Sequence, residues 1–258
     1  MDLGLSNKTA LVLGASSGLG FAIAKCLAGE GANVVMSARQ TERLDQALAA
    51  VKQSGAATAL PIDLQNQAAM ESAEQAIRKL TPDILVSNSG GPPPGGAVDS
   101  DLDKWRQQFE AMVLNQIRCI RAALPGMIEK KWGRILVIAS SGIVAPIPNL
   151  VISNSLRSAL VSFAKTLAAE VAASGVTVNT IVPGRIATPR VAQLDQMASE
   201  REKTDAASVK QRSIQAIPAG RYGDPSEFAS VAAFLVSERA GYVTGQMTRV
   251  DGGFIRSI

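Results

Sequence analysis

The sequence predicts an α/β protein in which helices cover both faces of a doubly wound, parallel sheet of about seven strands. Short, nearly continuous apolar runs alternate with longer helical patterns over most of the 258 residues. Strands covered on both faces have such continuous runs, and repeated strand–helix–strand units favour parallel pairing with right-handed crossovers. The chain shows no internal repeat and no linker, so we expect residues 1–258 to form a single domain.

The expected elements follow these patterns in chain order. Strands are expected at 9–14, 33–37, 58–62, 84–87, 134–139 and 176–182. Helices are expected at 18–29, 41–53, 66–80, 102–130 and 153–173. In the last of these, apolar residues recur at steps of three or four from Leu156 to Val171, which places them on one face. Gly31 and Gly175 stand where glycines commonly end helices.

Two segments interrupt the alternation. The run 90–96 (GGPPPGG) follows the fourth strand and predicts a stiff loop, because prolines and glycines exclude a helix there. Residues 190–216 are polar and charged and have a weak apolar stripe. Excursions of this length are commonly lids or binding loops, so a substrate lid is one interpretation and a solvated surface helix is the other.

Composition excludes several classes of protein. Apolar residues make up 47% and charged residues 19%, which is typical of a folded chain. The net charge of +4 is spread along the chain, so we expect no nucleic-acid partner. The chain has no histidine, which excludes serine or cysteine nucleophiles paired with histidine and histidine-ligated metals, and we expect no metal.

The pattern of apolar residues also bears on location. No run approaches 18 apolar residues, and the first residues lack a basic stretch followed by a long apolar one. We therefore expect no membrane association and a cytoplasmic location. In a reducing compartment, Cys26 and Cys119 are expected to be buried thiols within helices.

A glycine-rich turn predicts a dinucleotide site. In the segment 9–20 (TALVLGASSGLG), a buried strand leads into three glycines, and a helix follows at once. Glycines permit the tight turn and the close approach of the backbone to a pyrophosphate, while the helix N-terminus supplies free N–H groups. A merely structural turn is the alternative. We expect cofactor contacts at Gly14, Ser16, Ser17, Gly18, Leu19 and Gly20.

The glycine spacing resembles the T-G-x-x-x-G-x-G pattern of the short-chain dehydrogenase/reductase family, and the resemblance extends along the whole chain. The segment 83–90 (DILVSNSG) is similar to the family's N-N-A-G motif and keeps Asn88 and Gly90. Asn115 matches a helix asparagine, and Ser140 matches the active-site serine after the fifth strand. The segment 178–188 (VNTIVPGRIAT) and the G-R-x-G-x-P, V-T-G-Q and V-D-G-G stretches of 220–253 match C-terminal motifs.

The sequence is most similar in style to the 3-oxoacyl-[acyl-carrier-protein] reductases. This resemblance implies a Rossmann-like fold and an oxidoreductase that acts on a carbonyl or alcohol. It also implies a homotetramer or homodimer formed through the helices near 102–130 and 153–173.

The family's Y-x-x-x-K motif is replaced. The tyrosine is expected thirteen residues after Ser140, where Ser153 stands, and Arg157 stands in place of the lysine. No tyrosine or lysine lies between residues 140 and 160, and Tyr222 and Tyr242 resemble structural positions of the family. Milder departures are Leu13 and Ser87, which replace the motif threonine and the first asparagine of N-N-A-G.

The replacement changes the expected proton delivery. In the family, the tyrosine exchanges a proton with the carbonyl oxygen, while the lysine lowers the tyrosine pKa and binds the nicotinamide ribose. Serine does not titrate near neutrality and arginine stays protonated, but residues 153 and 157 share a helix face. We expect Arg157 to bind the ribose or its water, and a water to deliver the proton. The expected catalytic residues are Ser140, Asn115, Ser153 and Arg157.

Each of these residues also has a structural interpretation. Ser153 could cap a helix, and Arg157 could be a solvated or interface arginine. Ser140 could belong to a turn, and Asn115 could be a polar surface position.

The end of the second strand predicts NADP(H) as the cofactor. Ala38 stands where NAD-dependent relatives tend to have an aspartate, and Arg39 offers forked donors suited to a 2′-phosphate. Asp63 resembles the family's adenine-contacting aspartate. By the same resemblance, the remaining cofactor contacts are expected at Leu64, Asn88, Gly90, Arg157, Pro183, Gly184, Ile186 and Thr188.

The sequence therefore predicts an NADP(H)-dependent oxidoreductase for a small-molecule carbonyl or alcohol, with altered proton delivery. The alternatives are an NADP(H)-binding subunit or sensor that keeps the fold without the reaction, and non-redox chemistry such as dehydration. Residues 92–97 and 190–216 are expected to line the substrate pocket, and they match no pattern that names the substrate.

Overall fold

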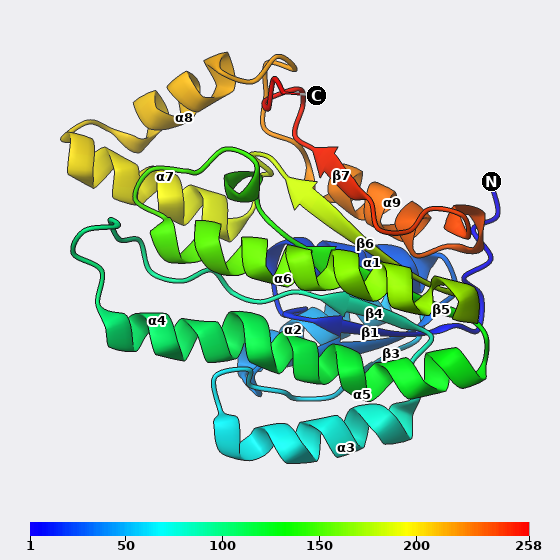
Figure 1. The fold of residues 1–258 in the computed structure, drawn as a ribbon. Coiled ribbons are helices and arrows are strands. Elements are labelled where there is room, and N and C mark those ends of the chain that lie inside the picture. The colour runs from blue at the N-terminus through cyan, green and yellow to red at the C-terminus, as the bar shows by residue number, and fades with distance from the viewer. Residues whose placement is uncertain (258) are drawn as a thin grey trace.

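The computed structural model describes residues 1–257 and contains a seven-stranded parallel sheet (Figure 1). The strand order is β3-β2-β1-β4-β5-β6-β7, and every neighbouring pair is parallel. The order reverses between β1 and β4, so the loops after these two strands diverge and leave a crevice at the carboxyl edge. The strands are β1 (Thr9–Leu13), β2 (Asn33–Ser37), β3 (Ala57–Ala59), β4 (Ile84–Ser87), β5 (Gly133–Ile138), β6 (Val176–Pro183) and β7 (Met247–Val250).

Helices cover both faces of the sheet, as the sequence predicted. One layer contains α1 (Gly18–Gly29), α2 (Glu42–Lys52) and α9 (Pro225–Leu235). The other contains α3 (Met70–Leu80), α5 (Asn115–Glu129) and α6 (Val151–Val171), with α4 (Leu102–Phe109) leading into α5. Helices α7 (Pro189–Glu202) and α8 (Ala206–Gln215) project beyond the carboxyl edge (Figure 1).

The two-sided cover explains the continuous apolar runs. In β1, Ala10 and Val12 pack into the core beneath α1 and α9, whereas Leu11 and Leu13 pack into the core beneath α3, α5 and α6. Successive strand residues point to opposite faces, so a strand between two cores needs apolar residues at every position.

Several expected boundaries were wrong. The third strand ends at Ala59 rather than residue 62, and the helix expected at 102–130 is divided by a π-helical turn at Glu110–Leu114. Helix α9 and strand β7 were not located from the sequence. Gly31 and Gly175 have the positive φ values of 85° and 76° that end helices, and 90–96 contains no helix, as expected.

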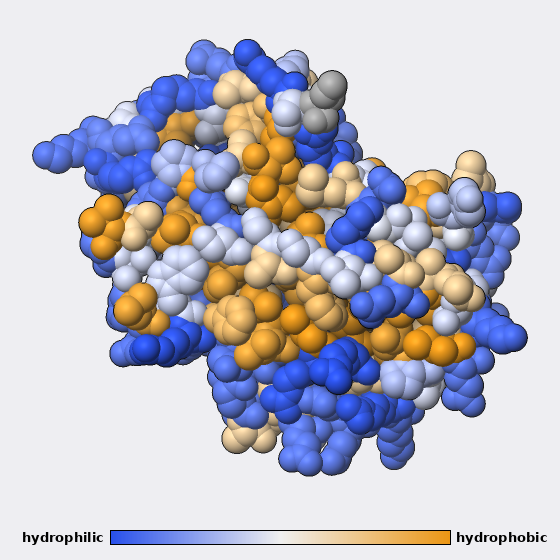
Figure 2. Space-filling model, in the orientation of Figure 1, coloured by the Kyte–Doolittle hydropathy of each residue, from blue (hydrophilic) through white to orange (hydrophobic). Residues whose placement is uncertain are grey.

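The expectation for the cysteines holds for Cys119, which is buried, whereas Cys26 is only half-buried. Within residues 1–257, no helix is long and apolar enough to cross a membrane. Figure 2 shows apolar side chains gathered across the face formed by α5 and α6. The exposed apolar residues include Phe109 at the end of α4, Leu114 in the π-helical turn and Ile128 in α5.

Candidate active site

A cavity of about 850 Å³ opens at the carboxyl edge of the sheet. Its walls come from the loops after β1, β2, β4, β5 and β6, the start of α6 and one face of α7. The predicted site residues on its walls are Gly14, Ser17, Gly18, Leu19, Arg39, Asn88, Gly90, Ser140, Ser153, Arg157, Pro183, Gly184, Ile186 and Thr188. Segments far apart in the sequence thus form one hollow, as the doubly wound topology requires.

The glycine-rich turn is fixed by close backbone approaches. Gly14 has a φ of 62°, and a Cβ added there would lie 2.6 Å from Nδ2 of Asn88. A Cβ added at Gly20 would lie 2.4 Å from the carbonyl oxygen of Gly14. Nδ2 of Asn88 also donates to that oxygen at 3.4 Å, which joins the loops after β1 and β4. Glycine is therefore required at both positions, and the N-terminus of α1 faces the cavity.

Two other glycines leave open space. A Cβ added at Gly90 would meet nothing within 4 Å, and one added at Gly18 would meet only Thr188, at 3.8 Å. The packing of the chain therefore does not require glycine at residue 90. Both residues line the cavity, so a ligand could approach the bare backbone there.

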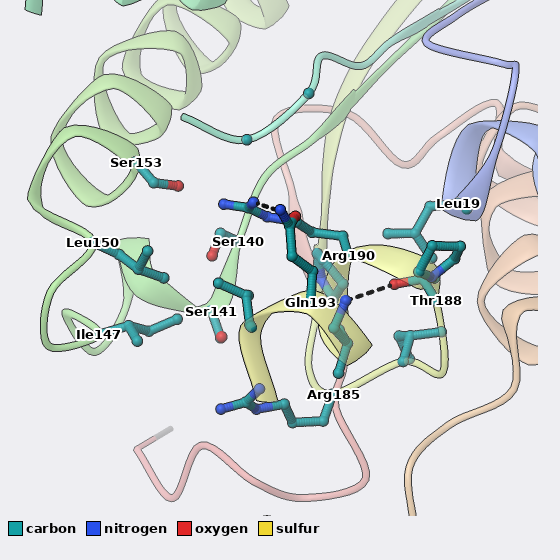
Figure 3. Close-up of a pocket in the computed structure, with 18 of the residues that line it drawn as sticks. Leu19, Ser140, Ser141, Ile147, Leu150, Ser153, Arg185, Thr188, Arg190 and Gln193 are labelled. Carbon is teal, nitrogen blue, oxygen red and sulfur yellow. Dashed lines mark hydrogen bonds between the residues drawn. The ribbon is translucent and has the colours of Figure 1, made fainter. Parts of the chain in front are cut away.

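The Ser140 and Ser153 side chains line the cavity from neighbouring elements (Figure 3). Oγ of Ser140 accepts a hydrogen bond from the Gly142 backbone N–H at 3.1 Å, so this serine caps the turn that follows β5. Ser153 lies within the first turn of α6, whose N-cap is Leu150, so Ser153 does not cap the helix. Within residues 1–257, no group bonds the Ser153 hydroxyl, which leaves it available to a ligand.

Arg157 lies one helical turn after Ser153 and is not a solvated surface arginine. Its Nη1 donates to the carbonyl oxygen of Ile138 at 3.0 Å, and its Nη2 donates to that of Ser89 at 3.3 Å. Burial and, to a smaller extent, the charge of Arg190 lower the pKa of the guanidinium to about 10. The group therefore stays protonated at neutral pH. A guanidinium has five N–H donors, so three remain for other partners.

Asn115 is fully buried and does not line the cavity, so the surface interpretation was wrong. It begins α5 directly after the π-helical turn, and its Nδ2 donates to the carbonyl oxygen of Leu64 at 2.8 Å. Its Oδ1 is buried without a hydrogen-bond partner in residues 1–257. A buried acceptor of this kind is costly unless a water or ligand satisfies it.

Four other predicted contacts lie outside the cavity wall, namely Ser16, Gly20, Asp63 and Leu64. Gly20 shapes the glycine turn, because a side chain there would collide with the carbonyl oxygen of Gly14. Oδ1 of Asp63 accepts a hydrogen bond from the Gln65 backbone N–H, and Leu64 holds Asn115. The adenine contact expected of Asp63 remains a prediction.

The cavity contains basic residues that the sequence analysis missed. Arg43, in the first turn of α2, lines the cavity with Arg39, and both are exposed without a carboxylate partner in residues 1–257. Arg190, in the first turn of α7, lines the opposite part of the cavity. The sequence held a signal for both: Arg43 closely follows the predicted contact Arg39, and Arg190 closely follows the predicted contact Thr188.

The segment 190–216 was expected to line the pocket, and only α7 does so. Arg185 bonds Asp195 at 3.1 Å, and the Tyr222 hydroxyl donates to the same carboxylate at 2.9 Å. These contacts fix α7 to the loops after β6 and before α9. Helix α8 does not contribute to the wall, and of residues 92–97 only Pro94 does. A further wall that was not expected comes from residues 147–150.

Together, the carboxyl-edge cavity, the glycine turn and the strand-end serine define a nucleotide-binding protein of the doubly wound class. Comparison with known families is more specific. The family model described as enoyl-(acyl carrier protein) reductase matches residues 14–255. Over 260 residues the chain is 34% identical to the 3-oxoacyl-[acyl-carrier-protein] reductase of Vibrio cholerae, covering 97% of this chain and 98% of the relative.

Two further relatives are similar to this chain over nearly its whole length. The D-beta-hydroxybutyrate dehydrogenase of Cupriavidus necator is 32% identical, covering 97% of this chain and 99% of the relative. The crystal structure of L-sorbose reductase from Gluconobacter frateurii, complexed with NADPH and L-sorbose, has a TM-score of 0.92 at 33% identity and covers 100% of both chains. The chain belongs to the short-chain dehydrogenase/reductase family.

Proposed function

We propose that the protein is an NADP(H)-dependent oxidoreductase that acts on a carbonyl or alcohol, with proton delivery that does not use a tyrosine. The observation that supports this most directly is the single cavity, which joins the glycine turn and Arg39 to Ser140, Ser153 and Arg157. A cofactor and a substrate could therefore occupy one hollow and react with each other.

The residues present fit NADP(H). The bare backbone at Gly18 and Gly90 leaves room for a ligand, and the N-terminus of α1 favours an anion such as pyrophosphate. Arg39 and Arg43 supply positive charge where a 2′-phosphate would lie, and Ala38 supplies no repelling carboxylate. The solved relatives support the same cofactor, because the L-sorbose reductase is a complex with NADPH.

The chain's own residues would act on the substrate oxygen. A bound nicotinamide supplies the hydride chemistry. The hydroxyls of Ser140 and Ser153 would hold the carbonyl oxygen and a water beside it. We assign to Oδ1 of Asn115 the role of holding a water on the path that resupplies the proton, because this buried acceptor has no partner in the described residues.

Arg157 would take over two roles of the family lysine. Its two bonds to the backbone hold the end of β5 and the loop after β4. Its remaining N–H groups are available to the nicotinamide ribose or its water. Its positive charge also favours negative charge that develops on the substrate oxygen. It does not exchange a proton near neutral pH, because its pKa of about 10 is too high.

The magnitudes allow catalysis without the tyrosine. A positioned acid–base group contributes roughly 10² to 10⁴ in rate. Holding two reactants together contributes about 7–11 kcal/mol separately. A site that keeps both partners in place would therefore be slower than its relatives and still active, with α7 as the lid over the substrate.

A second function is an NADP(H)-binding subunit or sensor. The observation that favours it is the absence, from the described cavity wall, of any group that titrates near neutral pH. Turnover separates the two functions, because a sensor binds NADPH without oxidising it.

The test is NADPH oxidation over a panel of ketones by the wild type and three variants. Ser140→Ala removes a donor to the substrate oxygen and should lower the rate by about 10²-fold or more. The double variant Ser153→Tyr with Arg157→Lys restores the family pair and should raise the rate, by up to about 10²-fold if only proton delivery was lost. Ser155→Ala, an exposed serine on the same helix, is the matched control and should change nothing.

Two results would contradict the proposal. An unchanged rate in Ser140→Ala would remove this serine from the site. Tight NADPH binding without oxidation of NADPH by any ketone would favour the sensor.

A further inference from the structure

The charged residues on the cavity wall are strongly unbalanced. One glutamate, Glu200, lines the cavity, together with Arg39, Arg43, Arg157, Arg185, Arg190 and Arg201. Arg185 pairs with Asp195, which compensates its charge. Arg201 pairs with Glu202, a carboxylate that Arg212 shares. Within residues 1–257, the other four arginines have no carboxylate partner.

These four arginines form two pairs at different ends of the cavity. Arg39 and Arg43 come from the end of β2 and the start of α2, where the proposed cofactor's 2′-phosphate would compensate them. Arg157 and Arg190 come from α6 and α7, beside the catalytic serines, and the proposed cofactor assigns no anion to them.

Arg157 and Arg190 converge on one short loop. Nη2 of Arg157 donates to the carbonyl oxygen of Ser89 at 3.3 Å, and Nη2 of Arg190 donates to that of Pro92 at 2.8 Å. Between these residues, a Cβ added at Gly91 would lie 3.1 Å from Nε of Arg190. Nη1 of Arg190 is held by Oε1 of Gln193 at 2.9 Å, and Figure 3 shows both residues at the centre of the hollow.

These three acceptors, and the Ile138 carbonyl oxygen that also accepts from Arg157, are all neutral oxygens. Carbonyl and amide oxygens satisfy N–H groups without compensating the charge. The two guanidinium groups therefore repel each other, and the charge of Arg190 contributes to the lowered pKa of Arg157. Like charges held together in a partly buried hollow are costly, and an anion between them would remove much of that cost.

Apolar side chains also line this part of the wall, together with the polar residues Asn149 and Gln193 and with Glu200. Ile147, Leu150, Leu194 and Met197 face the same cavity, from the loop before α6 and from α7. A ligand that fits this part of the cavity therefore combines an anionic head with an apolar body. A guanidinium fork matches the planar geometry of a carboxylate.

We propose that the substrate is an oxo acid, whose carboxylate is bound by Arg190 and Arg157 while its ketone faces Ser140 and Ser153 and its apolar body contacts the wall formed by α7. This inference rests on the proposed oxidoreductase function and names its substrate class. We expect Arg190 to determine this specificity, because Arg157 also joins the end of β5 to the loop after β4, so that replacing Arg157 would disturb the site itself.

The test measures binding, so that its outcome does not depend on turnover. Protein loaded with NADP⁺, which cannot donate a hydride, is titrated by calorimetry with 2-oxo-octanoate and with the neutral 2-oxo-octanamide of the same shape. The wild type should bind the acid about 10-fold or more tightly than the amide, since bonds to charged groups are the stronger ones. Arg190→Ala should remove this difference, and Arg190→Lys should keep part of it, because lysine keeps the charge but not the fork.

Arg201→Ala is the matched control. Arg201 lies on the same helix and the same cavity wall, is paired with Glu202, and should leave the ratio of acid to amide binding unchanged. Melting temperatures identify any variant that fails to fold. If Arg190→Ala does not fold, the acid-to-amide binding ratio of Arg190→Lys is compared with that of the wild type instead.

Three results would overturn the inference. The first is that the wild type binds the acid and the amide equally, and the second is that it binds neither. The third is that Arg190→Ala loses affinity for NADP⁺ while it keeps the ratio of acid to amide binding. The last result would assign this guanidinium to the cofactor. A protein that binds the acid selectively through Arg190 but never oxidises NADPH would support the site and refute the oxidoreductase, so the two failures are distinguishable.

Discussion

We expect the preference for NADP(H) to depend on two arginines whose contribution can be calculated and measured. Arg39 and Arg43 are exposed, line the cavity and have no carboxylate partner in residues 1–257. Their positive charges are therefore free to bind the 2′-phosphate, which distinguishes NADP(H) from NAD(H). The perturbation is Arg39→Ala, Arg43→Ala and the double variant.

The expected loss of NADPH affinity in these variants follows from the exposure of the two guanidinium groups. A hydrogen bond to a charged group contributes about 1.5–3 kcal/mol, and solvent screening places exposed arginines at or slightly below the lower end. Since about 1.4 kcal/mol corresponds to a tenfold change, each single variant should weaken NADPH binding about 10-fold and the double variant about 100-fold. NADH binding should not change, and the effect should decrease as ionic strength rises.

The assay is calorimetric titration of each variant with NADPH and NADH at low and high salt. Lys52→Ala removes a positive charge from the far end of the same helix, away from the cavity, and serves as the control. Unchanged NADPH affinity in the double variant would refute the reasoning. An equal loss for both cofactors would also refute it, because the arginines would then not recognise the phosphate.

Two further predictions concern pH and the lid. The rate of the chemical step should be nearly flat from about pH 5 to 9, because Ser140 and Ser153 do not titrate there. It should fall as the pH rises through the Arg157 pKa of about 10, since the positive charge is then lost, and a pH profile with a step near pH 7 would contradict this. Asp195→Asn weakens the anchor of α7, because Asp195 is 4% exposed and its carboxylate binds both Arg185 and the Tyr222 hydroxyl. In Asp195→Asn we expect proteolytic cleavage within 190–216 to become at least several-fold faster and the substrate KM to rise. Tyr222→Phe should have a smaller effect on both. Equal cleavage rates in wild type and Asp195→Asn would show that this carboxylate does not anchor the lid.

The doubly wound parallel sheet and the glycine turn could be predicted from the sequence because each leaves a recognisable pattern in a short run of residues. A strand between two cores must be apolar at every position, as β1 is, so its pattern is visible in the letters alone. Gly14 and Gly20 are required by approaches of the backbone to residues a short distance away in the fold, and the spacing of the glycines reflects this. The preference for NADP(H) was likewise readable from Ala38 and Arg39, and it agrees with the cofactor in the solved relative.

Short or exposed elements were harder to predict. Strand β3 has three residues and β7 is only partly buried, so neither carries a strong apolar pattern. The π-helical turn has no signature in composition, and Asn115, which directly follows it, is buried.

Only the tertiary structure decided how the charges of the site are arranged. Arg185 and Arg190 are five residues apart and look equivalent in the sequence, but the first is neutralised by Asp195 and the second meets neutral oxygens beside Arg157. Whether a charge is compensated depends on which chain segments meet at the carboxyl edge of the sheet, and these segments lie up to about a hundred residues apart. The sequence therefore determined that a nucleotide site exists, and the fold determined which of its arginines remain available to a substrate.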